Sequence, residues 1–190
     1  MPFNLSDLED YARVHRVPIL HPDSVRALKE LIQTHQPKTI LEVGTAIGYS
    51  AMQMASVHPD IQVTTLERDP EMVKRARANI NAHGFANQIT VVEGEAADFV
   101  LNHDIDLLFI DAGKAQYQVM FERFSPKVST KGVVVCDNYF MHGLTVENAP
   151  KHQRTIARRL TEFKEFLRSH PDFHTTILEV GDGLSVSVRR

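Results

Sequence analysis

Two places in the sequence put oxygen-bearing side chains directly after an apolar run. The stretch "LLFIDAGK" leads to Asp111, with Lys114 three positions later, and "GVVVCDN" leads to Asp137 and Asn138. If the two runs are neighbouring strands, two carboxylates and an amide meet at one end of a sheet. Hard oxygen donors without histidine or cysteine suit Mg²⁺ or Mn²⁺ rather than zinc.

Lys114 adds a candidate general base to this group. A hydroxyl bound to a metal ion gives up its proton more readily than a free hydroxyl does. The Lys114 amine can take that proton if the nearby cation and partial burial favour its neutral form. The alternative is that the three oxygen-bearing residues are ordinary turn formers at strand ends and that Lys114 is a surface lysine.

A second candidate region is the glycine-containing stretch "EVGTAIGYS". Gly44 and Gly48 stand where a predicted strand gives way to a helix, so backbone amides can approach an anionic ligand at the helix N-terminus. The stretch lacks the G-x-G-x-x-G pattern of dinucleotide-binding folds, which disfavours a nicotinamide cofactor. Glu67 ends the next predicted strand, where an acid can accept hydrogen bonds from both hydroxyls of a ribose. The alternative for Glu67 is a solvated charge.

Alternation of apolar strands with amphipathic helices predicts how these residues are positioned. Helices are expected at 23–35, 49–58, 70–84, 97–101, 116–124 and 155–169, and strands at 38–44, 62–68, 88–94, 106–111 and 132–138. This order indicates a doubly wound α/β sheet of parallel strands, whose ligands bind at the carboxyl ends of the strands. Two further strands, at 174–180 and 184–190, flank a Gly-Asp-Gly turn and predict an antiparallel hairpin.

Length and charge narrow the classes of function. The 190 residues suit one domain, and the net charge of −3 argues against a protein that coats nucleic acid by bulk electrostatics. No apolar run approaches the roughly 20 residues of a membrane span, and the N-terminal stretch lacks the order of a signal peptide, so we expect a cytoplasmic protein without a membrane partner. The single cysteine, Cys136, lies in a valine-rich run and is expected to be buried.

The stretches "LEVGTAIGYSA", "TTLERD", "VVEGEA", "FIDAGKAQY" and "VVCDN" occur in this order. Together they resemble the class I S-adenosylmethionine-dependent methyltransferases, specifically the metal-dependent O-methyltransferases of the catechol and caffeoyl-coenzyme A type. The resemblance runs from about Val17 to Arg190. It implies a seven-stranded Rossmann-like sheet in a single methyltransferase domain over 1–190, with N-terminal helices at about 1–36 before the sheet, and a homodimer.

The resemblance also implies roles for particular residues. The expected contacts to S-adenosylmethionine are Leu20, Glu42, Gly44, Ser50, Glu67, Ala96 and Asp111. The expected ligands of Mg²⁺ or Mn²⁺ are Asp111, Asp137 and Asn138, and Lys114 takes the base role. This chain has Ala46 and Ala97 where the family often carries an aromatic or polar residue near the adenine, which leaves the adenine pocket less defined.

These motifs do not identify the acceptor of the methyl group. A chelating site of this type suits two vicinal oxygens, as in a catechol or in 5-hydroxyuridine. The stretch 151–170 holds six Lys or Arg residues against two Glu, so Lys151, Arg154 and Arg158 could hold phosphates while a base enters the pocket. His142 is a further candidate substrate contact. The alternative for the basic stretch is a solvated helix face.

A second resemblance favours a tRNA acceptor. The stretches "EDYARVHRVPIL", "CDNYFMHGL", "RTIARRL" and "VGDGLSVSVRR" are similar to the bacterial tRNA 5-hydroxyuridine methyltransferases, which make 5-methoxyuridine at the wobble position of the anticodon. The leading expectation is therefore methylation of the tRNA anticodon region, with small phenolic acceptors as the alternative. A non-catalytic module that binds S-adenosylmethionine or nucleic acid is the competing class, and it would have no use for a base beside a metal.

Overall fold

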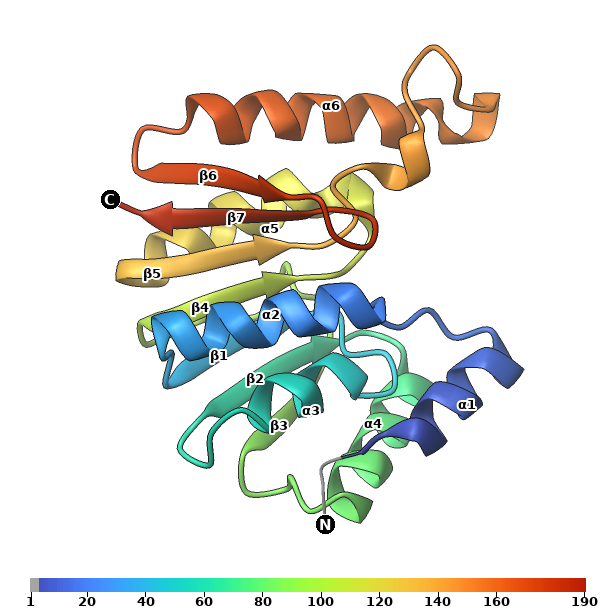
Figure 1. Cartoon of the computed structure of the whole chain (residues 1–190), viewed down its shortest axis with the longest axis vertical. Coiled ribbons are helices and arrows are strands. Elements are labelled where there is room, and N and C mark those ends of the chain that lie inside the picture. Colours follow the sequence, from blue (N-terminus) through green and yellow to red (C-terminus); the bar gives the residue numbers. More distant parts are fainter. Residues whose placement is uncertain (1–3) are drawn as a thin grey trace.

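The computed structural model describes residues 4–190 as an α/β sheet with helices on both faces (Figure 1). The strands are β1 (Thr39–Val43), β2 (Gln62–Glu67), β3 (Ile89–Glu93), β4 (Ile105–Ile110), β5 (Val128–Cys136), β6 (Phe173–Leu178) and β7 (Leu184–Arg189). Their order in the sheet is β3-β2-β1-β4-β5-β7-β6, and within residues 4–190 the only antiparallel pairings are those of β7 with β5 and β6. The predicted fold class, including the C-terminal hairpin, is confirmed.

The helices begin and end at local signals in the sequence. They are α1 (Ser6–His15), α2 (Pro22–His35), α3 (Tyr49–Ala55), α4 (Pro70–Ala82), α5 (Tyr117–Phe124) and α6 (Arg154–Ser169), with short 3₁₀ turns η1 (Lys114–Gln116), η2 (Ser125–Lys127), η3 (Met141–Gly143) and η4 (Lys151–Gln153). At the start of α4, for example, Asp69 accepts a hydrogen bond from the Glu71 amide and Pro70 fills the first helical position. Over residues 4–190, none of these helices has the length and apolar character needed to cross a membrane.

Both faces of the central strands are buried. Leu107 and Phe109 of β4 pack with α2 and α3 on one face, and Leu108 and Ile110 pack with α5 and α6 on the other. Successive side chains of a strand point to opposite faces, so burial on both sides requires the continuous apolar run seen in the sequence. Burial between the two helix layers holds each central strand in place, and it thereby positions the residues that follow the strand ends.

Two element predictions were wrong. No helix forms over 97–101, where the chain makes irregular turns, because one turn of helix cannot repay the cost of its nucleation. The strand expected from residue 132 starts at Val128 instead. Lys131 has a φ of 65°, and the register against β4 shifts between Ile105 and Leu107, so a bulge interrupts the apolar pattern without ending the strand.

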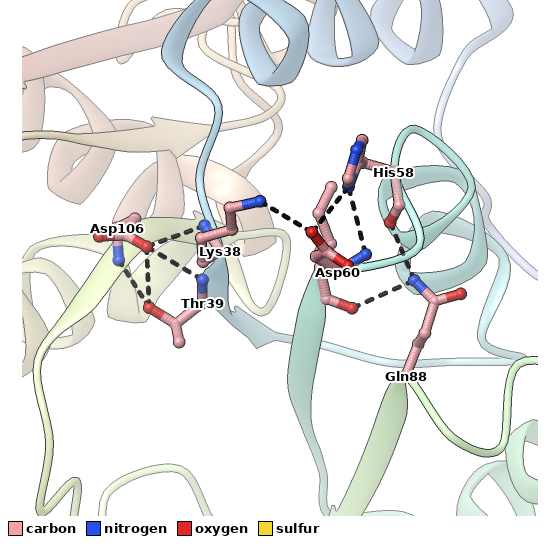
Figure 2. A network of polar contacts seen from close by, with 7 residues as sticks. Lys38, Thr39, His58, Asp60, Gln88 and Asp106 are labelled. Carbon is pink, nitrogen blue, oxygen red and sulfur yellow. Dashed lines mark hydrogen bonds and ion pairs between the residues drawn. The ribbon is translucent and has the colours of Figure 1, made fainter.

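Hydrogen bonds tie together the edge of the sheet where the parallel strands begin, here called the amino edge (Figure 2). Asp106 accepts hydrogen bonds from the Lys38 and Thr39 amides at 2.8 and 3.0 Å and from the Ser129 hydroxyl at 3.0 Å. Burial acts to raise the pKa of Asp106, but these hydrogen bonds outweigh it and leave the pKa below its ordinary value. Nearby, the Gln88 amide donates to three backbone carbonyl oxygens.

The opposite edge, here called the carboxyl edge, is where β1, β2, β4 and β5 end. Their arrowheads point to the same side in Figure 1, and α1 and the chain segment between β5 and α6 lie on that side. The predicted site residues follow these strand ends.

Candidate functional site

The backbone brings the predicted residues together at the carboxyl edge. The Asp111 amide donates to the Val43 carbonyl oxygen at 3.0 Å, and the Asp137 amide donates to that of Ile110 at 3.2 Å. The residues after β1, β4 and β5 are therefore held side by side. Gly44, with a φ of +104°, lies so close to Asp111 that a Cβ atom there would be 2.1 Å from the Asp111 carbonyl oxygen. Only glycine fits this contact.

A pocket of about 570 Å³ opens at this edge and is here called the donor pocket. Its wall includes six of the seven residues predicted to contact S-adenosylmethionine: Leu20, Gly44, Ser50, Glu67, Ala96 and Asp111. The carboxylate of Glu67 is fixed by three backbone amides, those of Ala46 at 2.9 Å, Arg68 at 2.9 Å and Asp69 at 3.0 Å. An acceptor group held this rigidly at the end of β2 suits recognition of a ligand hydroxyl pair.

Glu42, the seventh predicted residue, lies behind the donor pocket and not on its wall. Its side chain is fully buried and accepts hydrogen bonds of 2.5 Å from the hydroxyls of Ser50 and Thr65. Burial raises the pKa of Glu42 to about 8, although these two hydrogen bonds oppose the rise. The structure therefore places Ser50 between Glu42 and the pocket, and a direct contact of Glu42 with a ligand stays a prediction.

A second pocket, of about 740 Å³, adjoins the first and is here called the acceptor pocket. The residues common to both walls are Pro18, Ile19, Leu20, Tyr49, Asp111, Lys114 and Asn138. The acceptor pocket alone is lined by Asp137, His142 and Asp182. Asp111 and Lys114 therefore stand at the junction of two cavities, where a group could pass from one ligand to another.

The two carboxyl groups at this junction are buried and short of partners. Burial and the nearby Asp111 carboxylate raise the pKa of Asp137 to about 7, and burial raises the pKa of Asp111 while the Lys114 charge opposes it. The Oδ1 atom of Asp137 is buried without a hydrogen-bond partner, and its Oδ2 accepts from Nδ2 of the Asn138 side chain at 2.6 Å. Lys114 Nζ donates to Asn138 Oδ1. An unpaired buried carboxylate oxygen is the environment that a cation would stabilise.

The sequence profile of the O-methyltransferase family matches residues 5–190. The chain belongs to the O-methyltransferase family. It is accordingly an enzyme that moves a methyl group from S-adenosylmethionine to an oxygen, which agrees with two pockets meeting at one junction.

Relatives of this O-methyltransferase match it over most of its length. A catechol O-methyltransferase from Niastella koreensis is 32% identical over 88% of this chain and 80% of its own. A Staphylococcus aureus crystal structure, proposed to be a caffeoyl-CoA O-methyltransferase, is 36% identical with a TM-score of 0.92, covering 97% of this chain and 91% of its own. An O-methyltransferase from Bacillus cereus in complex with S-adenosylhomocysteine is 26% identical with a TM-score of 0.85, covering 100% and 93%.

The predicted basic contacts of the O-methyltransferase lie outside both pockets. Lys151, Arg154 and Arg158 are exposed on η4 and α6. Ile156, on the first turn of α6, lines the donor pocket, whereas Arg154 and Arg158, two positions before and after it, face another side of the helix. His142, by contrast, does line the acceptor pocket.

Tyr49 and Asp182 are pocket residues that were not singled out from the sequence. Tyr49 lines both pockets and donates a 2.7 Å hydrogen bond from its hydroxyl to Glu9 on α1. Asp182 lines the acceptor pocket from the turn between β6 and β7, which the sequence identified only as a turn. An acid between two glycines, in a hairpin expected to join the sheet, is the signal that could have found Asp182.

Proposed function

We propose that this O-methyltransferase uses Mg²⁺ or Mn²⁺ and methylates one oxygen of a vicinal pair, with wobble 5-hydroxyuridine of tRNA as its acceptor. The observation that carries the proposal is the junction of the two pockets, where Asp111, Lys114 and Asn138 line both walls. The proposal covers 1–190 as a single methyltransferase domain that works as a homodimer. Its subunit number is measurable by analytical ultracentrifugation.

The donor chemistry of the junction fits a hard divalent cation. Within residues 4–190, no three His, Cys, Asp or Glu side chains are grouped so that they could hold a metal ion. Asp111 and Asp137 therefore need the amide oxygen of Asn138 as the third ligand. This all-oxygen set and the unpaired Oδ1 of Asp137 suit Mg²⁺ or Mn²⁺.

The chain's own residues have distinct roles in this proposal. Glu67 accepts hydrogen bonds from the ribose of the methyl donor, and the absence of a side chain at Gly44 lets the donor lie against the backbone. The metal lowers the pKa of the acceptor hydroxyl when bound. Lys114 takes the hydroxyl proton at Nζ. The oxygen then forms its bond to the methyl carbon as the carbon–sulfur bond breaks, and the electron pair stays on sulfur.

An exposed basic group on η4 and the start of α6 supports a tRNA acceptor. Lys151, Arg154 and Arg158 are exposed there, available to phosphates of a tRNA whose wobble base enters the acceptor pocket. A small catechol is the second candidate, because the Niastella koreensis relative is a catechol O-methyltransferase. Both acceptors offer the vicinal oxygens that the proposed chelation requires.

Nucleoside mass spectrometry tests the proposal directly. Transfer RNA rich in 5-hydroxyuridine is incubated with the enzyme, S-adenosylmethionine and Mg²⁺, with and without a chelator. We expect 5-methoxyuridine that disappears with the chelator. Catechol methylation without any tRNA product would move the acceptor to small phenols, and chelator-resistant product would contradict the metal.

Charge reversal at Arg154 and Arg158 tests the proposed phosphate contacts. With both changed to Glu, we expect a higher KM for tRNA and a shallower dependence of that KM on salt concentration, because fewer counterions are released on binding. Catechol turnover, if present, should stay unchanged. Unaltered tRNA kinetics in the double variant would remove the basic group from the proposal.

A further inference from the structure

The turn between β6 and β7, here called the clamp turn, comprises Gly181, Asp182 and Gly183. It lies against the segment 138–143, which follows β5 and starts with the proposed metal ligand Asn138. We propose that the clamp turn holds this segment in place and that Asp182 is a positioning residue for Asp137 and Asn138. The inference takes its metal ion from the proposed function. The contacts between the clamp turn and the segment 138–143 do not depend on a metal.

The segment 138–143 cannot keep its shape unaided. Asn138, Met141 and His142 have φ values of 56°, 52° and 52°, in the left-handed region that side chains other than glycine rarely adopt. Such conformations persist when surrounding contacts impose them, and they gather at functional sites. Something outside the segment must therefore supply those contacts.

Hydrogen bonds to the clamp turn supply them. The Tyr139 amide donates to the Gly183 carbonyl oxygen at 2.9 Å, and the Phe140 amide donates to the Asp182 carbonyl oxygen at 2.8 Å. The His142 amide donates to Oδ1 of the Asp182 side chain at 2.6 Å. Three backbone amides of the segment therefore donate hydrogen bonds to two consecutive residues of the clamp turn, Asp182 and Gly183. The only side chain among these acceptors is that of Asp182.

Close packing fixes the clamp turn on both sides. A Cβ atom at Gly183 would be 2.6 Å from the ring of Phe140, and one at Gly181 would be 2.3 Å from the Ser24 hydroxyl oxygen on α2. The turn is therefore wedged between α2 and the segment 138–143. Since Gly181 and Asp182 also line the acceptor pocket, the turn serves as pocket wall and support at once.

The charge of Asp182 also acts on the site. Its side chain is 11% exposed, and its Oδ2 is buried without a hydrogen-bond partner. Burying an unpaired carboxylate oxygen is unfavourable. Near Asp137, this negative charge strengthens the attraction of the junction for a cation.

The test compares Asp182→Ala with the conservative Asp182→Asn in the full-length enzyme. Mn²⁺ alone is titrated and followed by electron paramagnetic resonance, and S-adenosylhomocysteine binding is measured by calorimetry. We expect D182A to weaken Mn²⁺ binding about 10- to 100-fold, as loss of groups that orient metal ligands does, and D182N, which keeps the acceptor oxygen without the charge, to restore part of that affinity. S-adenosylhomocysteine affinity should stay within about twofold, because Glu67 and Gly44 remain in place.

Asp172→Ala is the matched control. Asp172 is exposed just before β6, at the other end of the same hairpin, and its removal changes the charge equally. It should leave Mn²⁺ affinity unchanged. Equal Mn²⁺ affinity in D182A and the wild type would overturn the inference.

Amide hydrogen exchange separates this inference from the metal proposal. In D182A, with no metal added, the His142 amide should exchange at least tenfold faster, while amides of β4 stay unchanged. If the wild type binds no Mn²⁺, the metal part of the proposed function fails, and exchange at His142 alone then decides whether the clamp exists. If D182A does not fold, hydrogen exchange in the wild type is the test. A His142 amide that exchanges without protection in the wild type would also overturn the inference.

Discussion

Asp106 and Asp137, at opposite edges of the sheet, hold their carboxylates in opposite ways. At the amino edge, both carboxylate oxygens of Asp106 accept hydrogen bonds and its pKa is lowered. At the carboxyl edge, one oxygen of Asp137 has no partner and its pKa is raised. A fully paired carboxylate stabilises a fold, whereas one kept short of a partner is poised for a cation. The contrast locates the working edge of the enzyme without any ligand present.

Loss of the proposed base should give the largest effect. Lys114→Ala is expected to lower turnover by about 10²- to 10⁴-fold, the usual contribution of a positioned general base. S-adenosylhomocysteine affinity should stay near normal by calorimetry. Lys74→Ala, an exposed lysine on α4, is the control and should turn over normally. Normal turnover in K114A would contradict the role of Lys114 as the general base.

The raised pKa of Glu42 predicts a second effect, on stability. Because the folded chain holds this proton more tightly than the unfolded chain does, the contribution of Glu42 is complete below pH 4.5 and is lost as the pH rises through about 8. Between pH 5 and 8.5 the wild type should lose on the order of 3 kcal/mol more stability than Glu42→Gln, which cannot ionise. Urea unfolding without ligand measures this, and parallel curves for the two proteins would contradict it.

Removal of the Glu67 carboxylate should weaken binding of the methyl donor. Glu67→Ala is expected to lower S-adenosylmethionine affinity by about 10- to 100-fold, from the loss of charge-assisted hydrogen bonds of about 1.5–3 kcal/mol. Glu93 stands opposite Glu67 at the end of β3 and does not line the donor pocket. Glu93→Ala is therefore a matched control, and an equal loss of affinity in both variants would show a general charge effect instead.

The smallest effect is expected at the amino edge. Asp106→Asn should lower the free energy of unfolding by about 1–2 kcal/mol through weaker hydrogen bonds, while turnover at low temperature stays normal. The folded pKa of Asp106 lies below 3.8, so its stabilisation is present above that pH and is lost as the pH falls through the folded pKa. The variant should therefore show a weaker loss of stability in acid. Impaired turnover in D106N would contradict the purely structural role assigned to Asp106 at the amino edge.

Sequence patterns could predict the sheet and the convergence of Asp111, Asp137 and Asn138, because apolar runs that end in polar residues locate strand ends. They could not predict that Glu42 lies behind Ser50, since alternation along β1 does not say which charged side chain the helix after it covers. Nor could they place Asp182, whose position depends on how a C-terminal hairpin packs against α2 and the segment 138–143. Contacts between distant parts of the chain decide both cases.

The contact between Gly44 and the Asp111 carbonyl has a consequence for how this enzyme could change over evolution. No side chain fits at position 44, so the floor of the donor pocket beside Asp111 offers no room for variation. Residues that line the acceptor pocket alone, such as His21 and His142, are not tied to that floor by such a contact. New acceptor specificities should therefore arise by substitution in these walls, while the methyl-transfer geometry is inherited unchanged.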